Sequence, residues 1–393
     1  MLRIIGNKII LFIVSRYLSY FIQFLNSLII AYVLGPFYLG IWGFLALILQ
    51  YMNFGNFGID IALNVNLSTG DIKDVQKQSN LASNAVFATF ISCTLYLLIG
   101  VVLYLFDFAL FEKYMFTRFM LVVILISCMN YFNVLFLNIF RTYSLFTPIS
   151  IFQTILQALQ LPMFLFFKDV ELIWALLVMM IAAHFISMII FIRKMPLTLH
   201  WKIDYSLVKS LYKRGASLLS YALTFYILLL STRSMVGYFY PVETMGYFTF
   251  SANIASALIV GLSSLEFVLF PKMLNRLSSD SISEKTLTTF EEIRYIYMST
   301  AFLATAIGLL SYPVLLLFFK EYEGTESVFT YLVICQVIIS SGFGYSTLII
   351  SKGREQFLVV HGLVALFINL ALSYVAHKIF NCGYSIMALL LIV

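Results

Sequence analysis

Apolar runs of about 20 residues recur along nearly the whole chain, and they constrain its fold more than any other feature. A run of this length is what an α-helix needs to cross roughly 30 Å of hydrocarbon. The composition agrees, because 62% of the residues are hydrophobic and only 11% are charged, against roughly 45–50% and about 25% in soluble domains. Strand-like alternation over segments of about ten residues is absent from the sequence. The sequence therefore predicts an all-α polytopic membrane protein.

The expected helices follow from where the apolar runs begin and end. They cover residues 9–34, 38–62, 79–106, 118–140, 147–167, 170–192, 214–236, 244–270, 294–319, 326–350 and 356–377, and a twelfth begins near Gly383. At 1.5 Å per residue, the 11 residues from Gly383 to Val393 are too few to cross the hydrocarbon. The twelfth helix is therefore expected to be incomplete.

The longest polar interruption, RKMPLTLHWKIDYSLVKSLYKRG, divides the chain near its middle. Its apolar residues fall at helical spacing between lysines: Ile203, Leu207, Val208 and Leu211. This pattern is typical of an amphipathic helix lying on an anionic inner leaflet. The predicted organisation is an N-terminal lobe (1–192, helices 1–6), a cytoplasmic amphipathic connector (193–213) and a C-terminal lobe (214–393, helices 7–12).

The distribution of Lys and Arg predicts the orientation, because cytoplasmic loops carry the excess of these residues. Of the 24 Lys and Arg residues, 17 lie on the side of the N-terminus and 6 on the other side, with Arg16 inside the first helix. The N-terminus is therefore predicted to be cytoplasmic. The net charge of +6 is explained by this bias, and no nucleic-acid partner is expected.

Polar residues inside four expected helices follow the helical period and so share one face. The first helix carries Arg16, Ser19, Tyr20, Gln23, Asn26 and Ser27, and the second carries Gln50, Asn53, Asp60 and Asn64. The fifth carries Ser150, Gln153, Thr154, Gln157 and Gln160, and the seventh carries Ser217, Ser220, Tyr221, Thr224 and Ser231. Ser and Thr are expected to form hydrogen bonds between helices.

Charged residues in apolar helices need more than such bonds, because charge in hydrocarbon is costly. For Arg16 and Asp60 we predict a water-filled cavity lined by the first two helices, with an ion pair between them as the alternative. Glu266 is a candidate for binding a coupling ion, unless it reaches the inner surface near Lys272. Arg233 is a candidate substrate contact, unless it extends to the outer headgroups. His184 and His361 are single histidines on apolar helices, and packing is the expected role of each, with proton relay as the alternative.

Motifs for catalysis or cofactor binding are missing from the sequence. It has no Gly-rich phosphate loop, no HExxH and no GxSxG. The four cysteines form no CxxC pair, so neither a disulfide framework nor a zinc site is indicated. We therefore expect no cofactor, no metal and no enzyme activity.

Three stretches of the sequence resemble a known family. YVLGPFYLGIWGFLALILQYMNFGNFGID at residues 32–60, after a polar-striped helix that starts at GNKI, is similar to the N-terminal signature of the bacterial polysaccharide-unit (O-antigen) flippases. This family belongs to the multidrug/oligosaccharidyl-lipid/polysaccharide exporter superfamily. KIDYSLVKSLYKRGASLLSYALT resembles its entry to helix 7, and MGYFTFSANIA and LFPKM resemble its helix 8. The sequence departs from the family at GAS, where a proline is usual, and in its incomplete twelfth helix.

The resemblance implies two lobes of six helices around a central cavity that opens alternately to each side. It implies a substrate in which an oligosaccharide is attached to undecaprenyl diphosphate, moved across the inner membrane of a bacterium, with ion coupling. A cation suits the diphosphate, and amides and hydroxyls suit the sugar. The candidate substrate contacts are Arg16, Tyr20, Gln23, Asn26, Asn53, Asp60 and Arg233, and the candidate coupling residues are Asp60 and Glu266. Expected partners are the lipid bilayer, a polysaccharide polymerase and a chain-length regulator.

Two alternatives remain open. An ion-coupled drug antiporter of the same superfamily would use the same fold, with acids dominating its cavity, and Arg16 argues against cationic drugs. An integral-membrane polymerase or acyltransferase would belong to a different class. Enzymes resembling polymerases carry a large outer loop for chemistry, whereas the outer loops expected here have about a dozen residues or fewer.

Overall fold

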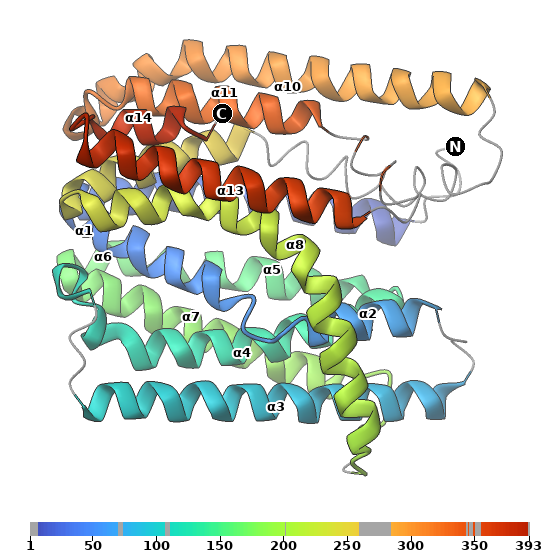
Figure 1. Ribbon diagram of the computed structural model, residues 1–393. Helices are drawn as coiled ribbons and strands as arrows, with labels where there is room; N and C mark the ends of the chain where they lie inside the picture. Colours follow the sequence, from blue (N-terminus) through green and yellow to red (C-terminus); the bar gives the residue numbers. More distant parts are fainter. Residues whose placement is uncertain are drawn as a thin grey trace. The chain divides into compact units, whose positions relative to one another are not determined.

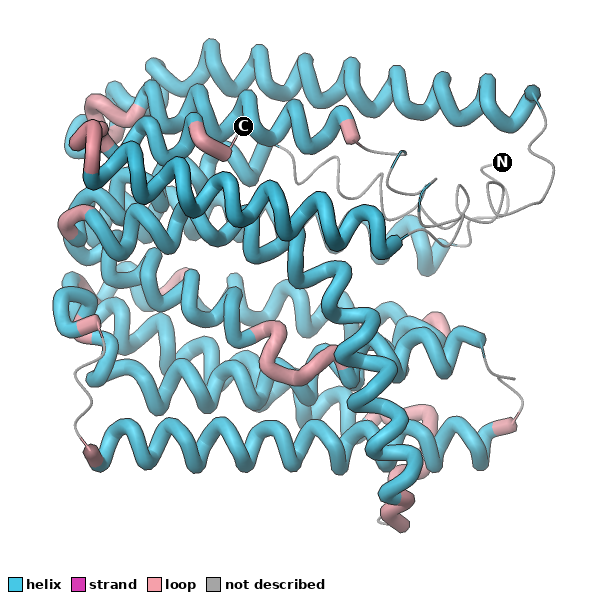
Figure 2. Tube along the Cα trace, in the orientation of Figure 1, coloured by secondary structure: helices cyan, strands magenta, loops and turns pink. Residues whose placement is uncertain are grey.

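The computed structural model describes residues 7–69, 74–106, 111–200, 202–258, 284–342, 345, 349 and 355–391. These residues form helices joined by short loops, and they contain no strand (Figure 2). Seven of the described helices are long and apolar enough to cross a membrane. The prediction of an all-α polytopic membrane protein is therefore confirmed.

Figure 1 labels the helices and colours the ribbon from the N-terminus to the C-terminus. Their bounds are α1 Asn7–Met52, α2 Ile59–Thr69, α3 Val75–Leu105, α4 Phe116–Thr142, α5 Phe146–Gln160, α6 Met163–Phe166, α7 Asp169–Arg193, α8 Tyr205–Phe239, α10 Glu284–Phe318, α11 Glu326–Ser341, α13 Glu355–Lys378 and α14 Tyr384–Leu389. Residues 242–258 are also helical. Two short 3₁₀ turns, Glu112–Tyr114 and Lys320–Tyr322, precede α4 and α11.

The chain forms two compact units. Unit 1 comprises Met1–Leu34 and Ile41–Leu223, and unit 2 comprises Gly35–Gly40 and Thr224–Val393. Both α1 and α8 therefore contribute residues to each unit. The division falls inside α8 and not at its start, because α8 continues without interruption through the expected start of the second lobe.

A kink in α1 occurs where two separate helices were expected. Gly35 has φ 61° and ψ 176°, a backbone conformation that side chains disfavour, and Pro36 follows it inside the helix. Here the chain enters unit 2 and makes two very close contacts. A Cβ at Gly40 would lie 2.0 Å from the Val242 carbonyl oxygen, and one at Gly246 would lie 1.9 Å from the Pro36 carbonyl oxygen. Only glycine allows the backbones to approach this closely.

The expected second helix, 38–62, is wrong at its C-terminal part. The structure ends α1 at Met52 and starts α2 at Ile59, with a turn between them. Gly58 in this turn has φ +71°, and its Cβ position lies 2.3 Å from the Gly215 carbonyl oxygen of α8. The apolar run is continuous in sequence, but this close approach requires a turn. The residues 50, 53, 60 and 64 therefore do not share one helix face.

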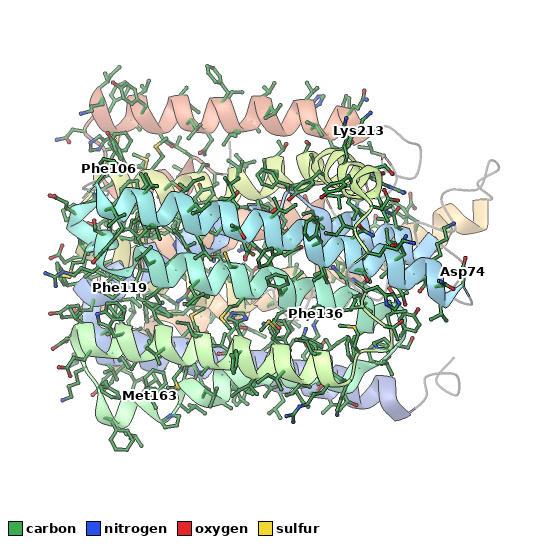
Figure 3. The ribbon with its side chains drawn as sticks, turned by 90° about the horizontal axis from the view of Figure 1, so that it is seen from below. Asp74, Phe106, Phe119, Phe136, Met163 and Lys213 are labelled. Carbon is green, nitrogen blue, oxygen red and sulfur yellow. The ribbon has the colours of Figure 1, made fainter. Side chains whose placement is uncertain are left out.

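The core of unit 1 forms around α4. This helix packs against α2, α3 and α7, and α5 packs against α7, as Figure 1 shows for the side-by-side α3, α4 and α7. Figure 3 places the labelled Asp74 and Lys213 at one end of these helices and Phe106, Phe119 and Met163 at the other. The buried residues that join them include Phe136, Ile139 and Phe140 of α4 with Phe191 of α7.

The C-terminal part of the predicted connector lies in α8. Its apolar residues Val208 and Leu211 are 7% and 1% exposed and belong to the core of unit 1. Residues 205–213 form the first turns of α8. The position of this segment relative to a lipid leaflet stays a prediction. Asp204 caps that helix, since its Oδ1 accepts from the backbone N–H groups of Ser206 and Leu207 at 2.9 and 3.2 Å. The hydrogen bonds from Ser206 and Leu207 lower the pKa of Asp204.

The expected fifth helix differs in extent from the prediction, whereas the short twelfth helix agrees with it. The expected helix 147–167 is interrupted after Gln160, near Pro162, and only the short α6 follows. At the other end of the chain, α14 has 6 residues and packs against α11 and α13. Asn369 of α13 secures this end of the chain, because its Nδ2 donates to the Leu390 carbonyl at 2.9 Å.

Candidate functional site

A cationic site lies on the N-terminal half of α1 in unit 1. Arg16 is half-buried and its Nε donates to the Tyr20 hydroxyl at 2.8 Å. The guanidinium also lies 5.5 Å from the centre of the Tyr20 ring, one helical turn further on. Arg141, in the last turn of α4, is close enough to Arg16 for the two charges to repel. The half-buried Arg16 and the exposed Arg141 thus give this part of unit 1 a positive charge beside the Tyr20 hydroxyl.

The polar stripes of α1 and α5 face each other next to this site. Ser15 and Ser150 share a hydrogen bond of 2.9 Å, and Ser19 and Thr154 share one of 2.6 Å. These contacts confirm that the serines and threonines join helices. They also fix the rotation of α1, so that Arg16 is held at a defined angle to α5.

Gln23 and Asn26, the other candidate substrate contacts on α1, differ in burial. Asn26 is 2% exposed and its Nδ2 donates to the Gln157 carbonyl at 2.9 Å, so it lies inside the contact between α1 and α5. Gln23, in contrast, is exposed. Gln23 can reach a ligand that also contacts Arg16 and Tyr20, whereas Asn26 holds two helices together.

Asp60 lies in the first turn of α2, after the turn that interrupts the expected helix. Its backbone carbonyl oxygen accepts from Asn138 Nδ2 at 3.2 Å, which ties the start of α2 to α4. A carboxylate is favoured at a helix N-terminus by the unpaired N–H groups there. This position gives Asp60 a structural role in starting α2, beside the functional one that was predicted.

Arg233 of α8 lies in unit 2 and is only 9% exposed. Its Nη2 donates to the Thr249 hydroxyl at 3.3 Å, on the helix of residues 242–258. An arginine that extended to lipid headgroups would be exposed, so the structure does not support that alternative. Glu266, the second candidate for ion coupling, lies outside the described residues.

A cavity of about 280 Å³ lies within unit 1, between the last turn of α1 and the helices α4, α5 and α7. Its polar lining consists of Gln50, Asn53, Ser127, Asn130, Gln153 and His184. Asn130 and Ser127 of α4 were missed at the sequence level. In the sequence, these two residues are recognisable only as polar residues within an apolar run. That pattern does not show which neighbouring helices their side chains face.

Hydrogen bonds organise the side chains around this cavity. Asn130 Nδ2 donates to Asn53 Oδ1 at 3.0 Å. Asn133 Nδ2 lies 3.1 Å from His184 Nδ1 and donates to the His184 carbonyl at 2.9 Å. The Oε1 atom of Gln153 is buried and has no hydrogen-bond partner among the residues that the structure describes. His184 is therefore tied into a polar network, whereas His361 is exposed and contacts the carbonyl of Phe357 at 2.7 Å.

The fold of this chain is similar to that of several solved polytopic membrane proteins. An inward-facing multidrug resistance MATE family transporter of the MOP superfamily matches with a TM-score of 0.77 and 12% identity, over 97% of this chain and 94% of its own. The lipid II flippase MurJ, in an inward closed conformation, matches with a TM-score of 0.69 and 14% identity, over 97% and 84% of the two chains.

A third similar structure is the MATE multidrug transporter DinF-BH in complex with R6G, with a TM-score of 0.69 and 14% identity over 99% and 92% of the two chains. At these identities the likeness establishes a shared fold. No protein-family model matches the sequence, and no curated protein sequence matches it significantly.

Proposed function

We propose that this chain is a MOP-superfamily flippase that moves an oligosaccharide linked to undecaprenyl diphosphate from the cytoplasmic to the periplasmic leaflet. The observation that carries the proposal is the half-buried guanidinium of Arg16, whose Nε donates to the Tyr20 hydroxyl at 2.8 Å in unit 1. Transport proceeds by alternating access and is coupled to an ion. The protein resides in the bacterial inner membrane with its N-terminus in the cytoplasm.

Two neighbouring cations favour a polyanionic ligand. Their mutual repulsion is relieved when an anion binds between them, and a diphosphate offers several oxygen acceptors for the planar guanidinium groups. Tyr20 and the exposed Gln23 supply neutral hydrogen-bonding groups next to that charge. Asp60 and Glu266 are the proposed coupling residues. The likeness to a lipid II flippase supports a substrate with a lipid carrier.

The second candidate function is ion-coupled export of drugs. It is favoured by the similarity to two multidrug transporters of the MATE type, one with a TM-score of 0.77. Cationic drugs require acidic residues where they bind. The residues that converge near Tyr20 are arginines instead, so a cationic drug is disfavoured at this site.

The test is complementation of a strain that lacks its own flippase, with surface polysaccharide as the measurement at matched membrane levels of protein. We expect Arg16→Ala to lose nearly all activity and Arg16→Lys to keep part of it, because lysine retains the charge but not the bidentate fork. Arg118→Ala is the matched control, since Arg118 is exposed at the opposite end of α4 from Arg141. Full complementation by Arg16→Ala would contradict the role of Arg16 in binding the substrate.

A further inference from the structure

Among the described residues, those that line the unit 1 cavity include no Asp, Glu, Lys or Arg. A metal ion, a diphosphate or an organic cation would each lack an opposite charge there. Burial of an uncompensated charge is costly in a low-dielectric site. The cavity therefore favours a ligand that is polar and neutral, unlike the ligand expected at Arg16.

The carboxamides of the cavity offer both donors and acceptors. Asn130 uses one amide hydrogen on Asn53 Oδ1 at 3.0 Å, which orients both groups and leaves the Asn53 amide hydrogens for another acceptor. Gln153 lines the cavity, and its buried Oε1 atom has no partner in the described part of the chain. A buried acceptor without a partner is destabilising, and it gains most from a ligand that donates a hydrogen bond.

His184 adds a donor of defined position. The amide nitrogen of Asn133 can only donate, so the His184 Nδ1 atom, 3.1 Å away, accepts. The proton of the neutral ring is then on Nε2, where it is available as a donor. The Asn133 side chain is fully buried and also donates to the His184 carbonyl at 2.9 Å, which holds the ring in place.

The remaining wall of the cavity is apolar and partly aromatic. It includes Phe152 and Leu156 of α5 and Met180 of α7, and the Phe152 ring centre lies 6.0 Å from that of His184. A pyranose ring has the matching chemistry, because its hydroxyls both donate and accept while its C–H face packs on apolar and aromatic side chains.

We propose that this cavity binds one neutral sugar ring of the transported oligosaccharide, with Gln153, Asn130 and His184 as its hydrogen-bonding groups. The proposal rests on the proposed flippase function and adds a carbohydrate subsite to it. The subsite is built entirely from unit 1, and its residues are different from the cationic group at Arg16.

The experiment uses the full chain purified in lipid nanodiscs. The probes are a panel of methyl glycosides of neutral hexoses and N-acetylhexosamines, detected by saturation-transfer NMR, and separately farnesyl diphosphate, detected by ³¹P line broadening beyond that in empty nanodiscs. We expect at least one glycoside to receive saturation. Gln153→Met should reduce that signal about fivefold, as expected for the loss of one hydrogen bond.

A second cavity variant and a matched control variant separate loss of binding from misfolding. Ala183→Leu fills the cavity from α7 without removing a hydrogen bond, and it should also abolish the glycoside signal. Gln336→Met makes the same chemical change on α11 of unit 2, and it should bind glycosides like the wild type. Each variant is accepted only with the elution profile and thermal midpoint of a folded protein.

The outcomes separate this proposal from the flippase proposal. Absence of signal from every glycoside, or an undiminished signal in both cavity variants, would overturn the sugar subsite and leave a hydrated cavity only. Glycoside binding without binding of farnesyl diphosphate would support the proposed sugar subsite and contradict the proposed diphosphate site at Arg16. Gln153→Met should leave the ³¹P broadening unchanged, whereas Arg16→Ala should eliminate it.

Discussion

Arg16 in unit 1 and Arg233 in unit 2 are both arginines inside apolar helices, but their surroundings differ. Arg16 is half-buried, bonds a tyrosine on its own helix and has a second arginine nearby. Arg233 is 9% exposed and bonds Thr249 of a neighbouring helix. The same residue type is therefore half-buried beside a tyrosine of its own helix in one unit and buried between two helices in the other. Burial and the kind of partner distinguish the two arginines, and sequence position does not.

The largest expected effect comes from disturbing a close backbone contact in unit 2, on the helix that carries Thr249, the partner of Arg233. Gly246 lies one turn before Thr249, and a Cβ at this position would lie 1.9 Å from the Pro36 carbonyl oxygen. Gly246→Ala should push the two backbones apart and lower the free energy of unfolding by about 3 kcal/mol, a typical cost of overpacking. Thermal unfolding of the purified protein measures it.

Gly383→Ala is the control for this glycine, because the nearest atom to its Cβ position is 4.0 Å away and its φ is not positive. We expect a change below about 0.5 kcal/mol for it. If Gly246→Ala were as stable as Gly383→Ala, the close contact with Pro36 would not contribute to the stability of unit 2.

The second prediction compares the replacement of each arginine by alanine. Arg233→Ala removes a large buried side chain and should cost about 2–4 kcal/mol of stability. Arg16→Ala should cost less than about 1 kcal/mol, because its side chain is half-exposed. Thermal unfolding and transport per folded molecule are measured for both. A loss of transport by folded Arg233→Ala, equal to that of Arg16→Ala, would assign Arg233 to the substrate site instead.

The smallest effect on stability is expected for Asp60→Asn. Asparagine keeps the size and the acceptor that the first turn of α2 uses, so the free energy of unfolding should change by less than about 1 kcal/mol. The charge is lost, so transport should fall while the protein level holds. Asn64→Ala, also on α2, is the comparison variant without a change of charge. Unchanged transport in Asp60→Asn would leave Asp60 with its structural role alone.

The sequence by itself determined the class of fold and the local contact of Arg16. Long apolar runs specify membrane helices because a helix satisfies its backbone hydrogen bonds within one segment. The spacing of Arg16 and Tyr20 is also local, and the hydrogen bond between them confirms that they share a face. The orientation in the membrane and the substrate remain predictions, since they depend on groups beyond the protein.

The tertiary structure alone decided which polar residues meet. The turn after Met52 exists because Gly58 and Gly215, distant in sequence, approach within contact, so the expected stripe from Gln50 to Asp60 is broken. The same holds for the unit 1 cavity, where four helices bring together residues that the sequence places more than 130 positions apart. Helical periodicity assigns a residue to a face, but packing between helices selects which faces meet, and that selection depends on contacts that no local pattern encodes.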